Sequence, residues 1–396
     1  MIGLFPDPYP GEIFYSICAR FADRAPYRSA YATLEALFGK RIRTIVELPG
    51  NLNYLVSILP PGSRYDVECF IRDHTLFPLY ELFLPEERVK TIRNGMGIDR
   101  IHGSHLRVGA AAGIKANKYL MYCPLCVEED RDNYGECYWH REHQVPGIKV
   151  CAEHSVWLEE SNISTDELRK FISAEKAIKE TISPLDKANK SFEYLRAIAC
   201  DVQWVFREGK FHIQGDNAIR ERYISALIKC GFSTYSGNVK TIQLVEAFTA
   251  HYPQDFLREL GCELEGRHKR NWVARISQAY QMQHPIRHLL MIQFLGLSTE
   301  EFFRSSNQSK PFGEGPWYCL NPICNGYKHA TIKEIHIGVS RKKGRNPIAT
   351  LECPSCGYTY CRVGPDRDEQ DKYRGKVIRY GNQWDTQLKQ LWIELS

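Results

Sequence analysis

The sequence predicts a mainly α fold: a helical N-terminal domain with a zinc-finger module, helix-turn-helix domains and a C-terminal zinc ribbon. Three observations support this prediction. Apolar residues recur at helical spacing through residues 1–112 and again through residues 201–305. Two groups of cysteines have the paired spacing of zinc ligands. Within the second group, apolar residues alternate with polar ones as they do in strands.

Length and composition are those of an ordinary globular protein. The 396 residues, of which 43% are apolar and 25% charged, suffice for several domains. A net charge of +5 is too small to indicate a nucleic-acid partner by itself. Pro6 breaks the first apolar residues, so no secretory leader is predicted. The longest apolar runs are too short to predict a membrane span.

The fourteen cysteines favour metal binding in a reducing compartment over disulfides. Seven of them, together with His154, fall into closely spaced pairs. The other seven are interpreted mostly as buried thiols that pack like small apolar side chains. They are Cys18, Cys69, Cys137, Cys200, Cys230, Cys262 and Cys361.

Residues 1–112 are predicted to form the helical N-terminal part of the molecule. An amphipathic pattern over residues 13–21 follows Pro10 and Gly11, and a second helix is predicted to end at Gly39. Further helices are predicted over residues 51–59, 67–74 and 85–93. We interpret the aromatic residues of this part as core.

Residues 113–160 contain the first group of candidate metal ligands. Cys123 and Cys126 form one pair, and after 24 intervening residues Cys151 and His154 form the second. Two such pairs let tight turns point four side chains at one tetrahedral Zn²⁺. We therefore predict a structural zinc site, which contributes to folding and has no open coordination position.

Other residues of this segment are weaker candidates. His140, His143 and Cys137 are interpreted as packed or hydrogen-bonded residues that support the zinc fold, and His140 is a candidate partner of a metal ligand. Glu136 and Glu153 would be the general bases of a catalytic zinc, but four protein ligands argue against that role.

Residues 161–200 are predicted to be an exposed helical connector, and residues 201–310 a helix-turn-helix DNA-binding region with short helices. Asn271 is predicted to cap one helix, and Ser298 with Glu301 to form a capping box on another. A basic cluster in this region suits either a solvated face or contacts with DNA phosphates. Its residues are Arg267, Lys269, Arg270 and Arg275.

Residues 311–365 are predicted to form the zinc ribbon, with Cys361 as a weak rival ligand. Its four ligands would be Cys319, Cys324, Cys353 and Cys356. Residues 335–339 and 358–363 are predicted strands, and a hairpin would present a basic tip to phosphates. The tip consists of Arg341, Lys342, Lys343 and Arg345. Residues 366–396 are interpreted as a C-terminal segment, the start of a truncated helix-turn-helix, which ends in a helical pattern that includes Trp384, Leu388, Leu391 and Trp392.

Signatures of catalysis are absent from the sequence. It contains no P-loop, no dinucleotide-binding fingerprint and no G-x-S-x-G elbow. The carboxylates show no spacing typical of a metal-dependent nuclease or of a transposase acidic triad. We predict a protein that is not an enzyme, with no catalytic residues. A zinc-dependent enzyme acting on nucleic acid is the alternative from a different class.

Four segments together resemble the TniQ/TnsD family of transposon target-selection proteins. They are residues 5–12 (FPDPYPGE), 74–78 (HTLFP), 122–126 (YCPLC), and 138–154, which opens on Tyr-Trp-His and closes on the Cys151–His154 pair. The stretch from Trp272 through residues 284–288 is similar to the longer, TnsD-like branch.

This resemblance implies a protein of the bacterial cytoplasm, associated with the nucleoid, that has no catalytic activity. Such a protein would bind a double-stranded DNA attachment site and recruit an AAA+ ATPase regulator (TnsC-like), which brings the transposase. The family's zinc ligands correspond to Cys123, Cys126, Cys151 and His154, and its DNA-reading helices to residues 215–300. The N-terminal helices, which have no nucleic-acid signature, are predicted to dock the ATPase.

The resemblance also implies a second arrangement. In CRISPR-associated transposons, TniQ-like members link an RNA-guided Cas complex to the transposition machinery. The alternative function is therefore an adaptor that contacts DNA only incidentally. The second cysteine group and the length of the chain favour the DNA-binding selector.

Overall fold

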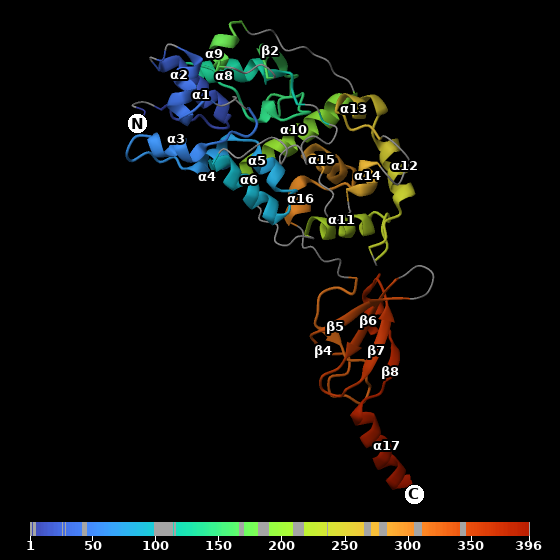
Figure 1. The fold of residues 1–396 in the computed structure, drawn as a ribbon. Coiled ribbons are helices and arrows are strands. Elements are labelled where there is room, and N and C mark those ends of the chain that lie inside the picture. Colours follow the sequence, from blue (N-terminus) through green and yellow to red (C-terminus); the bar gives the residue numbers. More distant parts are fainter. Residues whose placement is uncertain are drawn as a thin grey trace. The chain divides into compact units, whose positions relative to one another are not determined.

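The protein is described from a computed structural model, which covers residues 2, 5–25, 27, 29–41, 46–98, 114, 116–165, 170–180, 190–208, 218–235, 237–264, 271–276, 283–304, 311–340 and 346–395. The chain forms two compact units (Figure 1). Unit 1 consists of Met1–Arg220 and Val245–Ser305, and unit 2 of Glu221–Leu244 and Ser306–Ser396.

Unit 1 begins with short helices that share one apolar core. They are α1 (Phe14–Arg24), α2 (Ala30–Phe38), α3 (Leu52–Ile58), α4 (Val67–His74), α5 (Phe77–Glu81) and α6 (Glu86–Ile98). Ile17 and Cys18 of α1 are fully buried, which confirms the apolar face predicted for this helix. Phe14 packs edge-on against Phe70 of α4 with ring centroids 5.4 Å apart.

Capping residues set several helix ends as the sequence predicts. Gly39 ends α2 with φ 69, a left-handed conformation that glycine adopts without strain. The Asn271 side chain accepts a hydrogen bond from the Ala274 amide, 2.9 Å away. Ser298 and Glu301 exchange the reciprocal hydrogen bonds of a capping box, at 2.8 and 3.1 Å. All three predictions are confirmed.

The zinc-finger segment of unit 1 is built on a two-stranded antiparallel sheet. β1 (Tyr119–Tyr122) pairs with β2 (Glu159–Ser164), and α8 (Pro124–Tyr134) follows β1 directly. Pro124 at the first position of α8 suits a helix start, because that position needs no amide donor. The Gln144 side chain, in the short η1 (Glu142–Gln144), bonds both the amide and the carbonyl of Met121 and so ties η1 to β1.

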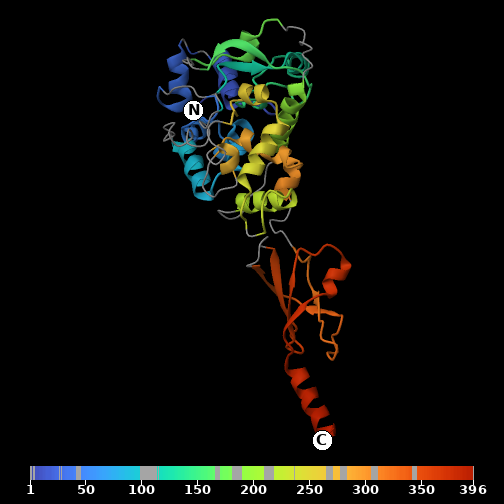
Figure 2. The same cartoon turned by 90° about the vertical axis from the view of Figure 1, so that its right-hand side faces the viewer.

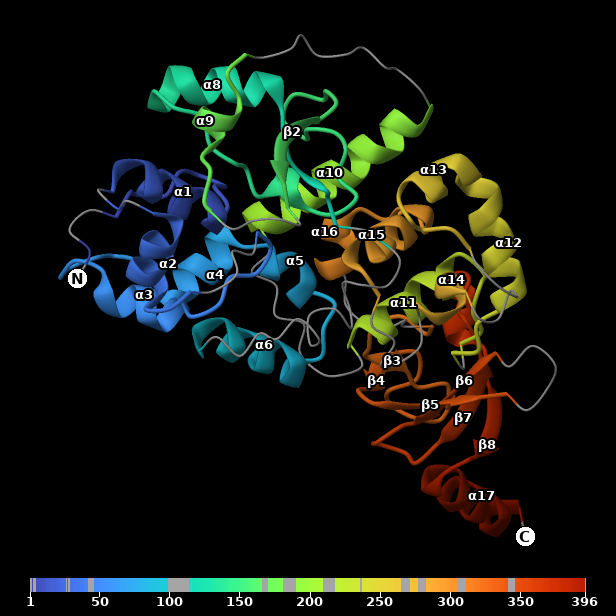
Figure 3. The same ribbon diagram turned by 45° about the horizontal axis from the view of Figure 1, so that its top comes forward.

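The later helices of unit 1 adjoin the earlier ones through α10 (Lys190–Glu208), as Figure 3 shows. The others are α9 (Ala174–Ala177), α13 (Gln254–Glu259), α14 (Trp272–Arg275), α15 (Pro285–Phe294) and α16 (Thr299–Arg304). The long α10 contacts α5, η1, α15 and α16. His288 of α15 stacks on Phe83, with ring centroids 4.2 Å apart. The segment predicted as an exposed connector therefore contains the start of α10, a helix that packs on both halves of unit 1.

Unit 2 contains the residues 221–244, which include most of α11 (Ala218–Lys229) and the start of α12 (Thr241–His251), and a C-terminal module (residues 311–395). In this module a four-stranded antiparallel sheet has the order β5 (Ile335–Val339), β6 (Pro347–Glu352), β7 (Thr359–Val363) and β8 (Lys376–Arg379). A smaller sheet pairs β3 (Trp317–Tyr318) with β4 (Ala330–Ile332), and η2 (Glu369–Tyr373) precedes β8. The chain then continues into α17 (Asn382–Leu395) (Figure 2).

Two features of the C-terminal module differ from the prediction. The two predicted strands, β5 and β7, do not pair with each other, because β6 lies between them. Residues 376–379 form an edge strand beside β7 that the sequence does not predict, while the helical pattern at the end of the chain corresponds to α17. Pairing stabilises this short strand, since Val377 faces Tyr360 across the strands and packs against the module's buried residues.

Candidate metal centres and their surroundings

The first cysteine cluster consists of Cys123, Cys126, Cys151 and His154, and the structure brings all four together. Cys123 caps the start of α8 and Cys126 lies on its first turn. A tight turn, closed by the hydrogen bond from the Ser155 amide to the Cys151 carbonyl, brings Cys151 and His154 back towards them. The three thiols are buried, and the ligand atoms of the four residues all lie within 4.8 Å of one another.

The spacing of these atoms fits a tetrahedral zinc ion. With Zn–S bonds of about 2.3 Å and Zn–N bonds of about 2.0 Å, tetrahedral ligands lie about 3.8 Å (S to S) and about 3.6 Å (S to N) apart. The Cys126 and Cys151 sulfurs are 3.7 Å apart. The His154 Nδ1 atom lies 3.6, 3.3 and 3.7 Å from the sulfurs of Cys123, Cys126 and Cys151. The donors therefore suit zinc in type, number and geometry.

Glu129 orients the histidine of this cluster. Its Oε1 atom lies 2.9 Å from Nε2 of His154, the ring nitrogen that faces away from the sulfurs. A carboxylate in this position accepts the Nε2 proton, which leaves the lone pair of Nδ1 free to bind a metal. Glu129 is one member of an acidic run on α8, and nothing in its local sequence distinguishes it from Glu128.

His140 and His143 form a stack beside the cluster. Their ring centroids are 4.9 Å apart, and His140 also stacks on Tyr138 at 4.3 Å. His140 Nε2 lies 2.9 Å from a carboxylate oxygen of Asp130, while His143 Nε2 is 4.0 Å from the Cys126 sulfur. The possible ligand atoms of Cys126, His140 and His143 also lie within 4.8 Å of one another. His140, however, already contacts the carboxylate of Asp130.

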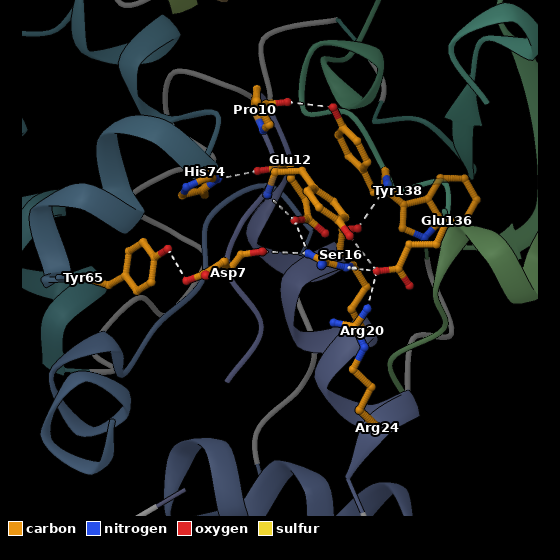
Figure 4. Close-up of polar contacts among 12 residues, drawn as sticks. Asp7, Pro10, Glu12, Ser16, Arg20, Arg24, Tyr65, His74, Glu136 and Tyr138 are labelled. Carbon is orange, nitrogen blue, oxygen red and sulfur yellow. Dashed lines mark hydrogen bonds and ion pairs between the residues drawn. The ribbon is translucent and has the colours of Figure 1, made fainter. Parts of the chain in front are cut away.

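A buried ion-pair frame connects the N-terminal residues to the first cluster (Figure 4). Arg20 of α1 donates to Oε2 of Glu12 and to Oε1 of Glu136, both at 2.8 Å. Glu136 also pairs with Arg24 and accepts from the Tyr9 hydroxyl at 3.0 Å. The Arg20 guanidinium lies 3.6 Å above the Tyr9 ring. Each charge in the frame thus has an opposite charge beside it, as burial requires.

Burial shifts the pKa of Glu12 in this frame and of His74 beside it. It raises the pKa of Glu12 to about 7, although the neighbouring Arg20 charge acts to lower it. His74, whose Nδ1 atom lies 2.7 Å from the Glu12 carbonyl, is also buried, and burial lowers its pKa to about 4. The imidazole is therefore neutral at pH 7 and donates Nδ1–H to the Glu12 backbone.

Backbone hydrogen bonds complete this connection. Residues 5–12, which we call the N-terminal motif, run alongside the segment that follows α8. The Ile13 amide donates to the Trp139 carbonyl at 3.0 Å, and the Arg141 amide donates to the Gly11 carbonyl at 2.8 Å. The Tyr138 hydroxyl donates to the Pro10 carbonyl at 2.9 Å (Figure 4). Three of the segments that carry the family resemblance therefore meet at one place.

The second cysteine cluster lies in the C-terminal module and is made of thiols alone. Cys319, Cys324, Cys353 and Cys356 are all buried, and their sulfurs lie within 4.8 Å of one another. The separation of 3.8 Å between the sulfurs of Cys319 and Cys356 matches the edge of a zinc tetrahedron, about 3.8 Å. Cys361, the predicted weak rival, lies on β7 outside this group.

Most of the predicted nucleic-acid-binding residues lie outside the described part of the chain. These are Arg267, Lys269, Arg270, Arg341, Lys342, Lys343 and Arg345. Arg275 is described, at the end of α14, and is half-buried. Sequence reasoning did not single out Glu129, Glu12 or Arg20, because each depends on a partner that is distant in the sequence.

The fold and the two clusters define a class of protein with two zinc-type modules on a largely helical chain, and comparison with known sequences identifies its family. Residues 198–395 match the family described as Tn7-like transposition protein D, and residues 3–158 match TniQ. The first match covers half of the chain, so the chain belongs to the TniQ/TnsD family.

One curated relative is Transposon Tn7 transposition protein TnsD of Escherichia coli. It is 34% identical to this chain over 152 residues, which cover 38% of this chain and 30% of the relative. The match therefore spans less than a third of the relative's length. Among the residues that the structure describes, no helix is both long enough and apolar enough to cross a membrane.

Proposed function

We propose that this protein is a sequence-specific DNA-binding selector of a transposon target site, without catalytic activity of its own. It would act at the nucleoid in the bacterial cytoplasm and recruit an AAA+ ATPase regulator, which in turn brings the transposase. The match of residues 198–395 to the Tn7-like transposition protein D family is the observation that carries this proposal.

The packing of α10 supports a protein that couples DNA binding to recruitment. The TnsD-type match begins within α10, while the TniQ match ends at residue 158. Arg207 of α10 pairs with Glu153, which lies between Cys151 and His154, at 2.8 Å. Arg141 of the zinc-finger segment donates to the Phe206 carbonyl at 3.0 Å. One helix thus connects the segment that would recruit with the segment that would read DNA.

We assign a structural Zn²⁺ to each cysteine cluster. The ligands are Cys123, Cys126, Cys151 and His154 at the first site, and Cys319, Cys324, Cys353 and Cys356 at the second. Bound zinc would supply cross-links between distant parts of the chain and no open coordination position for water. With its sheet and buried thiols, the C-terminal module would then be a zinc ribbon.

The DNA-reading elements would be the short helices of residues 215–300, arranged as helix-turn-helix units. α11 and α12 are joined by a tight connection in which Ser233 and Val239 form an isolated β-bridge. Phosphate contacts would come from Arg267, Lys269, Arg270 and Arg275 and from the loop that holds Arg341, Lys342, Lys343 and Arg345. Such contacts set register on the duplex, while helix residues in the major groove read the bases.

Footprinting of the purified chain on genomic DNA fragments tests this function. We expect protection of one short sequence without any partner protein, because a selector carries its own specificity. Protection that appears only when an RNA-guided Cas complex is added would instead support the adaptor. A zinc-dependent activity on nucleic acid, lost on replacement of Glu153 while the fold and both metals persist, would support an enzyme.

A further inference from the structure

The loop between Cys324 and β4 is rigid and faces solvent. The Tyr327 amide donates to the Cys324 carbonyl at 2.9 Å, and the Lys328 amide donates to the Cys319 carbonyl at 2.8 Å. The next residue, His329, exchanges backbone bonds with Gly326 and Cys319 at 3.0 and 3.1 Å. Both cysteines belong to the second cluster, so the loop is fixed by the residues that would hold the zinc.

Three consecutive side chains of this loop point away from the protein interior. Tyr327 is 38% exposed, although its neighbour Cys324 is buried, and Lys328 and His329 are also exposed. The Lys328 ammonium lies 5.3 Å from the centroid of the Tyr327 ring, a cation–π contact that limits the directions in which the lysine can reach. We call residues 327–329 the knuckle loop.

In the described part of the chain, Lys328 has no ion-pair partner. The ion pairs of the C-terminal module use other cations: Arg362, Lys372, Arg374 and Arg379. Among the residues that the structure describes, no carboxylate forms an ion pair with Lys328. A fixed cation beside an exposed aromatic ring, with no acid to compete, suits an anionic partner that also offers flat apolar surface.

The backbone of Lys328 determines which residues this position tolerates. Its φ is +58, in the left-handed region that residues with a Cβ adopt only with strain. Glycine or asparagine would take this conformation more easily. The conformation therefore belongs to the turn that the two cysteines fix, and it allows glycine or asparagine to replace the lysine without distorting the loop.

We infer that the knuckle loop contacts the sugar–phosphate backbone of duplex DNA, with Lys328 on a phosphate and the Tyr327 ring against the adjacent sugar. This inference rests on the proposed function and assigns part of its DNA contact to a surface outside the predicted basic clusters. The hydrogen bonds to Cys319 and Cys324 hold the loop in place before DNA arrives, so binding requires little further ordering. The contact adds affinity and does not read bases.

The test compares two variants that tolerate the left-handed conformation with one that keeps the charge. Lys328→Gly and Lys328→Asn remove the cation at no cost in backbone strain, and Lys328→Arg retains it. We expect the first two to bind the footprinted duplex about fivefold more weakly and to lower the slope of log K against log salt by about 1. Lys328→Arg should bind like the wild type. Zinc content should be unchanged in all three, and all three should keep the folded C-terminal module.

Lys389→Gln is the matched control, because it removes one exposed positive charge from α17 in the same module. Equal weakening by Lys389→Gln and Lys328→Gly would overturn the inference, since it would show an effect of net charge alone. Unchanged affinity and salt slope in Lys328→Gly would also overturn it, while the wild-type footprint would leave the proposed function intact. The absence of any wild-type footprint would refute the proposed function itself. Weakened binding to single strands with unchanged binding to duplex would assign the loop to another ligand and overturn the inference.

Discussion

The two cysteine clusters have the same chemistry but very different surroundings. The first lies beside η1, and a helix with several carboxylates begins directly after Cys123 and holds Cys126. The second lies in a sheet module whose knuckle loop exposes Tyr327, Lys328 and His329. A metal at the first site would join segments that are distant in sequence, whereas a metal at the second would support a small module and its exposed loop.

This difference indicates that the two clusters have separate roles. A cluster that is bordered by acids is poorly suited to contact DNA, because phosphates would meet like charges. Its surroundings suit the internal organisation of a recruiting domain. A cluster at the base of an exposed, positively charged loop has the electrostatics that DNA requires. The predictions below test this division.

Loss of a metal ligand should give the largest effect and should act on only one unit. Cys126→Ser should abolish the first zinc site and unfold the zinc-finger segment together with the N-terminal motif, because structural zinc contributes about 10 kcal/mol or more to such folds. Cys356→Ser should unfold the C-terminal module alone. Limited proteolysis with mass spectrometry, alongside zinc analysis, checks both. The division would fail if Cys356→Ser exposed residues 1–165 to the protease.

The buried frame should contribute far more than a surface ion pair of the same chemistry. Glu12→Gln keeps an acceptor for the Tyr9 amide but removes the charge that faces Arg20. We expect the free energy of unfolding of unit 1 to fall by about 2 kcal/mol, since the buried Arg20 loses its one fully buried carboxylate partner and keeps only Glu136. Urea unfolding, with hydrogen exchange of residues 9–24, measures it.

The matched change is Glu352→Gln in the C-terminal module. Glu352 pairs with Arg379 at 2.9 Å, but both side chains are exposed, so the loss should stay below about 1 kcal/mol. If Glu12→Gln and Glu352→Gln lower the free energy of unfolding equally, the buried frame contributes no more stability than an exposed ion pair.

Local features of the fold were predictable from the sequence, and long-range ones were not. Both ligand sets, the glycine at the end of α2 and the capping box at Ser298 follow from patterns a few residues long. The pairing of Glu12 with Arg20 and of Arg20 with Glu136 depends on the approach of α1 to the segment after α8. Hydrophobic periodicity within a segment does not predict which distant segment packs against it.

The strands show the same limit. β5 and β7 have the alternation of strands, but β6 pairs between them and β8 forms at an edge. A short strand such as β8 is stabilised by its neighbour more than by its own residues, so four residues are too few for the sequence alone to predict it. Likewise, Glu129 could be separated from the other acids of α8 only by the position of His154.

Acid should destabilise unit 1 through its buried histidines. Burial lowers the pKa of His74 to about 4 and the pKa of both His284 and His288 to about 3. The unfolded chain takes up these protons near pH 6.5 and the folded chain does not, so stability is lost as the pH falls below about 6.5. For His74 the loss should reach about 2 kcal/mol at pH 5 relative to pH 8.

His74→Asn isolates this contribution. The difference in unfolding free energy between the wild type and His74→Asn should shrink by that amount on acidification, because proton uptake by metal ligands and by Glu12 occurs in both proteins. The described histidines of the C-terminal module, His329 and His336, are exposed. We therefore expect no comparable loss of stability on acidification from these histidines. A pH-independent difference would show that folding leaves the pKa of His74 unchanged.

The smallest expected effect concerns the affinity of the first site for its metal. Glu129→Gln replaces the carboxylate that orients His154 and should weaken zinc binding at this site about tenfold, because the imidazole becomes a poorer and less fixed donor. The second site contains no histidine and should keep its affinity in the same molecule, which makes it an internal control. Asp132→Asn, at another exposed position of the same helix, controls for the loss of a negative charge on α8. Stepwise zinc release to a chelating indicator separates the two sites. If both sites weaken together, or if Asp132→Asn weakens the first site equally, Glu129 acts through general electrostatics and not through His154.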